Sequence, residues 1–143
     1  MKEILNKAVE IAIDAHKNQL DKNGETYIFH VMRVGLRGKN DEEKITGILH
    51  DVVEDSNYTF EDLKNAGIPE TILEALKCLT KSSDEEPYED FINRIKKNPL
   101  AIRVKLNDLE DNMDIKRLSK IGENETKRLT KYLKAYEELR NLL

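Results

Sequence analysis

Four ionisable residues stand together in a segment that is otherwise mostly apolar, where His50-Asp51 is followed closely by Glu54-Asp55. Read as one helix, the segment places the two pairs one turn apart, so all four side chains share a face. Burying unpaired charges of this kind costs several kcal/mol for each ion even after the protein relaxes. A divalent cation would neutralise the carboxylates, and a metal-dependent enzyme is therefore the leading interpretation.

Histidines elsewhere in the chain could complete a metal site. The sequence has three, of which His30, like His50, lies in an apolar stretch typical of a buried helix; the third is His16. A single histidine in such a setting is more often a hydrogen-bonded core residue than a metal ligand. Two histidines in similar settings, one of them next to Asp51, favour a metal site instead.

Asp108 is the candidate for a fourth ligand, because it stands at the polar margin of the apolar run 102–109. The alternative is an exposed acidic stretch, since Glu110, Asp111 and Asp114 follow, and the sequence does not separate Asp108 from Asp111. A mixture of imidazole and carboxylate groups suits manganese, iron or zinc without selecting among them. The candidate ligand set is His30, His50, Asp51 and Asp108.

Glu54 and Asp55 are candidates for moving the proton of an attacking water molecule beside the metal. Neighbouring carboxylates titrate as a coupled pair, so the sequence does not divide the roles of acid and base between them. The alternative is a solvated last turn of a helix. Negative charge at that end is unfavourable by roughly 0.3–1 kcal/mol per group, which mildly favours a functional role.

Composition narrows the classes of partner. The chain has 143 residues, close to the usual size of one domain, and nothing divides it, so residues 1–143 are expected to form a single domain. Its net charge of −4 argues against a nucleic acid as the main partner, because such binders usually carry a basic stripe. No long apolar run or signal peptide occurs, so we expect no membrane contact and a cytoplasmic location.

Helical patterns fill nearly the whole chain. Apolar residues recur at helical spacing, whereas no alternating strand pattern or hairpin dipeptide occurs. Polar caps, prolines and Gly67 mark where helices begin and end, with Asp41 and Thr59 as expected N-caps. The expected helices span about residues 2–19, 27–36, 41–55, 59–67, 69–80, 87–98, 99–109 and 125–142, with 115–124 less certain. The sequence predicts an all-α bundle with short loops.

Several segments, taken in order, resemble the motifs of the HD-domain phosphohydrolases, and most closely the hydrolase domain of RelA/SpoT-type proteins and its small stand-alone homologues. Residues 48–55 (ILHDVVED) are nearly identical to the central motif of that family. Residues 15–30 resemble the opening motif, Leu79-Thr80-Lys81 resembles a following segment, and residues 104–113 resemble the third motif. The resemblance spans roughly the first four-fifths of the chain.

This resemblance implies an HD-type helical bundle that removes the 3′-pyrophosphate from guanosine tetra- and pentaphosphate, the small nucleotides of the stringent response. The cofactor would be Mn²⁺, with another divalent metal as the alternative. The resemblance implies that the metal ligands are His30, His50, Asp51 and Asp108, and that the catalytic pair is Glu54 and Asp55. It implies that the substrate contacts are Lys22, Asn112, Arg128 and Tyr132.

Three departures from the family pattern keep other functions open. Asp21 stands where the family commonly has an arginine that packs on the guanine base, and Leu109 and Asp114 occupy positions that are often basic. One alternative is a phosphohydrolase of another nucleotide or of a phosphomonoester such as the 2′-phosphate of NADPH. Another is a nucleotide-binding bundle without catalysis. The sequence leaves the native metal, the regulation and the oligomeric state open.

Overall fold

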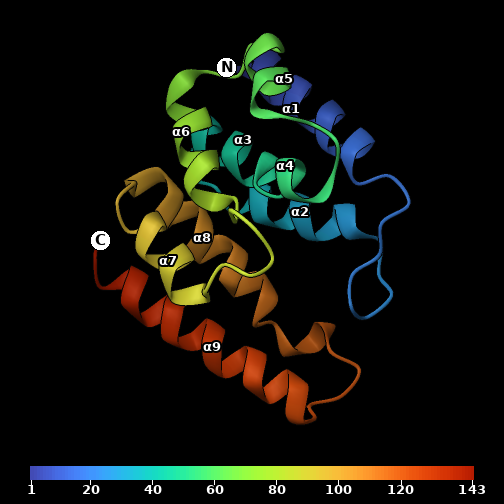
Figure 1. Ribbon diagram of the computed structural model, residues 1–143. Helices are drawn as coiled ribbons and strands as arrows, with labels where there is room; N and C mark the ends of the chain where they lie inside the picture. The colour runs from blue at the N-terminus through green and yellow to red at the C-terminus, as the bar shows by residue number, and fades with distance from the viewer.

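Helices joined by short loops make up the protein, whose computed structural model describes residues 1–143. No strand forms, and one antiparallel bridge joins Leu20 to Thr26. The predicted all-α class is confirmed (Figure 1). The helices are α1 (Lys2–Ala15), α2 (Tyr27–Leu36), α3 (Asp41–Leu49), α4 (Val52–Asp55), α5 (Phe60–Asn65), α6 (Glu70–Leu79), α7 (Tyr88–Ile95), α8 (Pro99–Asn112), the 3₁₀ helix η1 (Ile115–Arg117) and α9 (Glu123–Arg140).

Side-chain caps explain where several helices begin. Asn40, Thr59 and Asn98 each accept a hydrogen bond from the backbone N–H three residues later, which satisfies a donor that the helix itself leaves unpaired. The predicted cap of Thr59 and the stop at Gly67, whose φ is +96°, are confirmed. The prediction for α3 was wrong by one residue, because Asn40 is the cap and Asp41 is the first helical residue.

Helix α1 ends earlier than the expected boundary near Gln19. Asn18 adopts a left-handed conformation with φ of 65°, which a continuing right-handed helix does not allow. The side chain of Gln19 turns back and donates hydrogen bonds to the backbone carbonyls of Ala15 and Asp55. The end of α1 is therefore tied to α4, and the other boundaries differ from the expected ones by a few residues.

The largest correction concerns the acidic quartet, which the sequence placed on one continuous helix. The helix is interrupted at His50 and Asp51, so that the quartet is divided between the end of α3 and the short helix α4. His50 uses its ring nitrogen Nδ1 to donate to the carbonyl of Gly47 at 2.6 Å, and Asp51 adopts φ of −108° and ψ of 0°. The two pairs therefore do not lie on one continuous helix.

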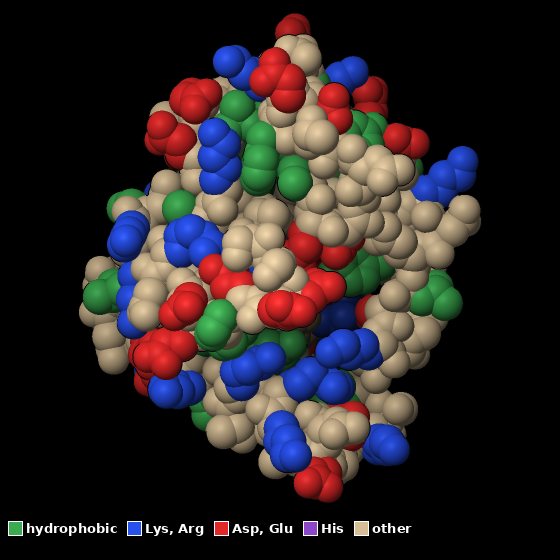
Figure 2. Space-filling model, viewed as in Figure 1, with side chains coloured by type: hydrophobic (Ala, Val, Ile, Leu, Met, Phe, Trp, Pro, Cys, Tyr) green, Lys and Arg blue, Asp and Glu red, His purple; other side chains and the backbone are tan.

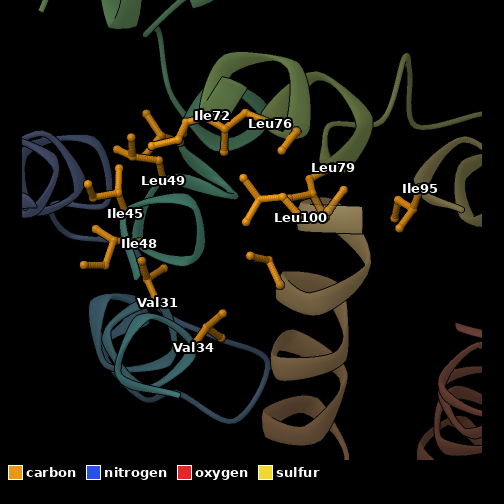
Figure 3. Close-up of a cluster of buried hydrophobic side chains, with 14 of the residues drawn as sticks. Val31, Val34, Ile45, Ile48, Leu49, Ile72, Leu76, Leu79, Ile95 and Leu100 are labelled. Atoms are coloured by element: carbon orange, nitrogen blue, oxygen red, sulfur yellow. The ribbon is translucent and has the colours of Figure 1, made fainter. Parts of the chain in front are cut away.

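Helix α3 lies inside the bundle and packs against α1, α2, α6 and α8. Its apolar side chains Ile45, Ile48 and Leu49 are buried, and Figure 3 shows them among side chains of α2 and α6. Full burial of such a side chain contributes about 1.5–3 kcal/mol. The end of α3, where His50 and Asp51 follow, is therefore held from several sides.

Two glycines let α2 and α3 approach closely. A Cβ atom built on Gly47 would lie 3.2 Å from the backbone of Gly35, and one built on Gly35 would lie 2.5 Å from Cγ1 of Ile48. Only residues without a side chain allow this spacing. Because His30 is on α2 and His50 directly follows α3, the glycine contact helps to set the distance between the two histidines.

Helix α9 packs on α8 through the buried residues Ala135 and Leu139, and in Figure 1 it lies at the end of the molecule opposite to α1 and α5.

Charged side chains of both signs cover the face in Figure 2, where a hollow opens between acidic groups on one side and lysines and arginines on the other. None of the helices combines the length and the apolar character that crossing a membrane requires.

The glycine contact gives a stability prediction. Gly35→Ala should destabilise the protein by about 1–3 kcal/mol, because overpacking against Ile48 outweighs the gain of about 1 kcal/mol in helix propensity. Urea denaturation of the wild type and the variant measures the change. In an Ile48→Ala background the same substitution should be neutral or stabilising. A stabilised Gly35→Ala single variant would show that the contact does not constrain α2 and α3.

Candidate functional site

Side chains from three separate parts of the chain converge beside the end of α3. Nε2 of His30, on α2, lies 3.0 Å from Oδ1 of Asp108, on α8. Nε2 of His50 lies 3.0 Å from Oδ2 of Asp51 and 3.3 Å from Oδ1 of Asp108. The four side chains that the sequence singled out as metal ligands are therefore brought together, and three of them, His30, His50 and Asp51, form a group able to hold a metal ion.

Hydrogen bonds behind the two imidazole rings determine which nitrogen faces the cluster. Nδ1 of His30 lies 2.6 Å from Oδ2 of Asp111, and Nδ1 of His50 lies 2.6 Å from the carbonyl oxygen of Gly47. Both partners are acceptors, so each Nδ1 carries the hydrogen and each Nε2 of a neutral ring offers a lone pair. Nε2 of His50 is buried without a hydrogen-bond partner. Two lone pairs and two carboxylates fit a divalent cation.

The charges of this cluster depend on one another. Burial opposes the charged form of His50, but Asp51 and Asp108 outweigh it and hold the pKa of His50 well above its ordinary value. Burial likewise opposes ionisation of Asp51, yet His50 keeps the pKa of that carboxyl low. The carboxylates thus require positive charge beside them. A divalent cation would supply it and would leave both histidines neutral.

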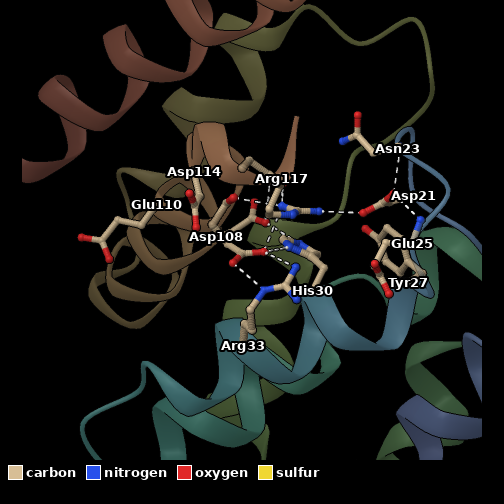
Figure 4. A network of polar contacts seen from close by, with 12 residues as sticks. Asp21, Asn23, Glu25, Tyr27, His30, Arg33, Asp108, Glu110, Asp114 and Arg117 are labelled. Atoms are coloured by element: carbon tan, nitrogen blue, oxygen red, sulfur yellow. Dashed lines mark hydrogen bonds and ion pairs between the residues drawn. The ribbon is translucent and has the colours of Figure 1, made fainter. Parts of the chain in front are cut away.

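Asp111 is a residue whose role the sequence left undecided. Its carboxylate is 1% exposed and accepts hydrogen bonds from His30, Arg33, Arg37 and Arg117. Figure 4 shows His30, Arg33 and Arg117 converging from α2 and from the segment after α8. Burial opposes its charge, but the bonds from His30 and the arginines keep its pKa low. Asp111 therefore lies behind the ring of His30, whereas Asp108 lies in front of it.

Asp21, the main departure from the family pattern, is engaged within its own loop. Its Oδ1 accepts hydrogen bonds from the backbone of Asn23 and Glu25, and its Oδ2 pairs with Nη2 of Arg117 at 3.0 Å (Figure 4). Burial opposes ionisation, but the bond from Glu25 and the guanidinium of Arg117 lower the pKa of Asp21. Its negative charge is therefore matched by an arginine.

Two further partners of the ligand carboxylates were not anticipated. The hydroxyl of Tyr27 donates to Oδ2 of Asp51 at 2.5 Å, and the buried ammonium of Lys105 pairs with Oδ2 of Asp108 at 2.8 Å. Asn112, expected to contact substrate, donates to Oδ1 of Asp108 at 3.1 Å. Both Tyr27 and Lys105 occur in the motifs, but their spacing in sequence carries no sign of these contacts.

Glu54 and Asp55 line the cleft beside the cluster. Glu54 accepts a hydrogen bond from the backbone N–H of Lys81 at 3.0 Å. Partial burial, followed by the negative charges of Asp51 and Glu54, raises the pKa of Asp55 to about 7. A carboxyl group with a pKa near neutrality can both accept and return a proton, as general acid–base chemistry requires.

Two adjoining cavities meet at the cluster. The larger has a volume of about 640 Å³, within the range of small-ligand sites, and its lining includes the expected contacts Lys22, Asn112, Arg128 and Tyr132. The smaller has a volume of about 140 Å³ and contains His50 and Asp108 in its wall. Asp51 lines both. The candidate ligands therefore lie where the two cavities join.

Positive charge gathers along this junction. Burial and then the charges of Arg128 and Lys81 lower the pKa of Lys22, and burial and then Lys81 and Lys22 lower the pKa of Lys131. Lys22 and Arg128 line the larger cavity and Lys81 and Lys131 line the smaller one, so four cations lie around the junction. Lys131 had not been singled out in the sequence, and Lys81 only by its place in a motif. Cations beside a candidate metal site suit a ligand with several phosphates.

Curated proteins with known names resemble this chain, although no profile of a protein family matches it. A guanosine-3′,5′-bis(diphosphate) 3′-pyrophosphohydrolase of Aquifex aeolicus is 32% identical over 139 residues, or 90% of this chain and 20% of that protein. A protein of the same name from Haemophilus influenzae is 32% identical over 72% of this chain and 17% of that protein. A GTP pyrophosphokinase of Streptomyces coelicolor is 27% identical over 97% of this chain and 18% of that protein. The chain thus spans about a fifth of the length of these relatives.

A solved structure supports the same relationship at the level of the fold. Its description is that of a metazoan ortholog of SpoT that hydrolyzes ppGpp, and it matches with a TM-score of 0.79 and 20% sequence identity. The match covers 95% of this chain and 84% of that one. This chain therefore shares the fold of that structure, and in its sequence it resembles the RelA/SpoT-type hydrolase domains.

Proposed function

We propose that residues 1–143 form a metal-dependent phosphohydrolase that removes the 3′-pyrophosphate from guanosine 3′,5′-bis(diphosphate). The observation that carries this proposal is the convergence of two imidazoles and two carboxylates at the junction of the two cavities. The names of the curated relatives support the substrate. The cations around the junction support a ligand with several phosphates.

Mn²⁺ is the ion that we propose for the cluster, on the basis of the family resemblance and the mixed donor set. When bound, it neutralises charge on a phosphoryl oxygen and lowers the pKa of a water molecule. The chain's own contribution is to hold the ligands in place. Asp111 fixes the ring of His30, Gly47 fixes the ring of His50, and Tyr27 holds Asp51.

Glu54 and Asp55 handle the proton in this proposal. Water attacks the 3′-linked phosphorus and gives a proton to the carboxylate pair, while the bond between that phosphorus and the 3′-oxygen breaks. The pair then returns the proton to the 3′-oxygen, and the products are guanosine 5′-diphosphate and pyrophosphate. The pKa of Asp55, at about 7, supports its part in this transfer.

The larger cleft receives the nucleoside and its 5′-phosphates. Lys22 and Arg128 offer positive charge there, and the ring of Tyr132 offers a surface for the base or sugar. Asp21 had favoured another substrate, such as the 2′-phosphate of NADPH, because an acid cannot offer the cation that the arginine of the family supplies. Arg117, which pairs with Asp21 and lines the larger cleft, brings a cation to this place, so the guanosine nucleotide remains our proposal.

Catalysis gives the first test of this function. Purified protein with Mn²⁺ should release pyrophosphate from guanosine 3′,5′-bis(diphosphate), and Asp51→Ala should abolish release because a ligand is lost. A coupled pyrophosphate assay measures both, with the exposed surface substitution Asp90→Ala as the matched control. A panel that includes NADPH and other nucleotides tests the substrate. Release no greater than that of Asp51→Ala, with every divalent metal tried, would contradict the proposal.

The contact behind His30 gives a test of metal binding. Asp111→Asn should weaken Mn²⁺ binding roughly 10- to 100-fold, because it removes the charged acceptor that orients the ring of His30. Titration calorimetry or the electron paramagnetic resonance signal of free Mn²⁺ measures the affinity. Its neighbour Glu110, which is far more exposed, supplies the control substitution Glu110→Gln. Equal affinities for Mn²⁺ in the two variants would rule out this role for Asp111.

The raised pKa of Asp55 gives a test in metal-free protein. Between its ordinary value of 3.8 and about 7, the folded state holds a proton that the unfolded state releases, so this stabilisation is lost as pH rises through the window. Asp55→Asn, which does not titrate, should therefore gain stability relative to the wild type between about pH 5 and about pH 8. Urea denaturation at both values measures the difference. Asp90→Asn is the control and should show no such gain. If the difference in unfolding free energy between Asp55→Asn and the wild type were the same at both pH values, the raised pKa of Asp55 would be refuted.

A further inference from the structure

The smaller cavity has properties that the proposed function has not yet used. Its volume of about 140 Å³ is less than a quarter of that of the adjoining cleft, at about 640 Å³. It is therefore too small for a nucleoside together with its phosphates. Its wall contains the candidate ligands His50, Asp51 and Asp108 and side chains of α7 and α9, including Tyr88 and Lys131.

Tyr88, the first residue of α7, lines this cavity with a hydroxyl that has no partner. The oxygen is buried and makes no hydrogen bond. The ring is held between Phe91, at 6.1 Å between centroids, and Tyr132, at 6.4 Å, and the ammonium of Lys131 lies 4.6 Å from its centroid. A buried hydroxyl without a partner costs free energy, which a ligand that accepts its hydrogen would recover.

The charge of the cavity selects the kind of ligand. Three lysines, Lys81, Lys105 and Lys131, line it together with three carboxylates, and Lys105 pairs with one of these, Asp108. Two of those carboxylates, Asp51 and Asp108, belong to the candidate metal site, where a divalent cation would neutralise them. The ammonium groups of Lys81 and Lys131 each lie more than 4.0 Å from any carboxylate oxygen. The cavity therefore suits a compact anion that accepts hydrogen bonds.

We propose that the smaller cavity holds the pyrophosphate part of the substrate and that the hydroxyl of Tyr88 donates a hydrogen bond to one of its oxygens. Lys131 and Lys81 offset its charge. This inference rests on the proposed function, because it places the scissile bond at the junction and the nucleoside in the cleft. When the bond to the 3′-oxygen breaks, pyrophosphate remains in the smaller cavity while the nucleoside diphosphate lies in the larger one.

Tyr88→Phe tests this assignment because it removes the hydroxyl and keeps the ring. Protein with saturating Mn²⁺ is titrated with inorganic pyrophosphate and, separately, with guanosine 5′-diphosphate. We expect Tyr88→Phe to weaken pyrophosphate binding about fivefold to tenfold and to leave binding of the nucleotide unchanged. The melting temperature should stay the same or rise. Tyr136→Phe is the matched control, since that hydroxyl donates to Glu110 at an exposed position.

Lys131→Gln provides a second, independent variant. It should weaken pyrophosphate binding and reduce the dependence of that binding on salt, because one cation is removed from the cavity. Unchanged pyrophosphate binding in Tyr88→Phe, or equal weakening for both ligands, would overturn the assignment. If the wild type hydrolyses the guanosine substrate but Tyr88→Phe binds pyrophosphate normally, only this inference fails. If Tyr88→Phe weakens pyrophosphate binding but the wild type does not hydrolyse the guanosine substrate, the proposed function fails. The assignment of the smaller cavity to pyrophosphate then still stands.

Discussion

Two carboxylates buried beside two imidazoles can stay ionised only if positive charge lies next to them, and this requirement organises the structure around Asp51 and Asp108. Removal from water penalises each charged group. The ammonium of Lys105 offsets part of the charge of Asp108, and the rest of the cluster has to be balanced by protons on the histidines or by a cation. The surrounding contacts favour the second solution. Each imidazole uses Nδ1 as a donor to a fixed acceptor, which leaves both Nε2 atoms directed at the same point.

The scaffold meets this requirement through close packing rather than through the acidic segment alone. Gly35 and Gly47 bring α2 and α3 together, and the interruption after α3 turns His50 and Asp51 toward α8. Behind the cluster, Asp111 joins His30 to three arginines, so that the ligand ring is held by a network rather than by a single contact. The same network reaches Asp21 through Arg117 and so joins the loop between α1 and α2 to η1.

The two cavities divide the site according to chemistry. The larger one has room for a nucleoside and is lined by polar and charged side chains together with the ring of Tyr132. The smaller one is compact, is lined by three lysines and three carboxylates, and contains the unpaired hydroxyl of Tyr88. Because Asp51 belongs to both, a substrate that fills them would place the bond between nucleoside and phosphate at the ligand cluster. This division explains why cations occur on both sides of the junction.

Local interactions made most of the fold predictable from the sequence. Helical periodicity and caps such as Thr59 act within a few residues, and the central motif is contiguous, so the all-α class and the pairs His50-Asp51 and Glu54-Asp55 followed from the sequence alone. The helix break at His50 depends on a side-chain bond that periodicity does not reveal. Tertiary structure also placed Asp108 beside Nε2 of His30 and Asp111 beside its Nδ1, and it brought Lys131 and Tyr88 to the smaller cavity. These residues come from separate helices, whose packing angles and distances are set by the whole core and are not encoded in any sequence spacing.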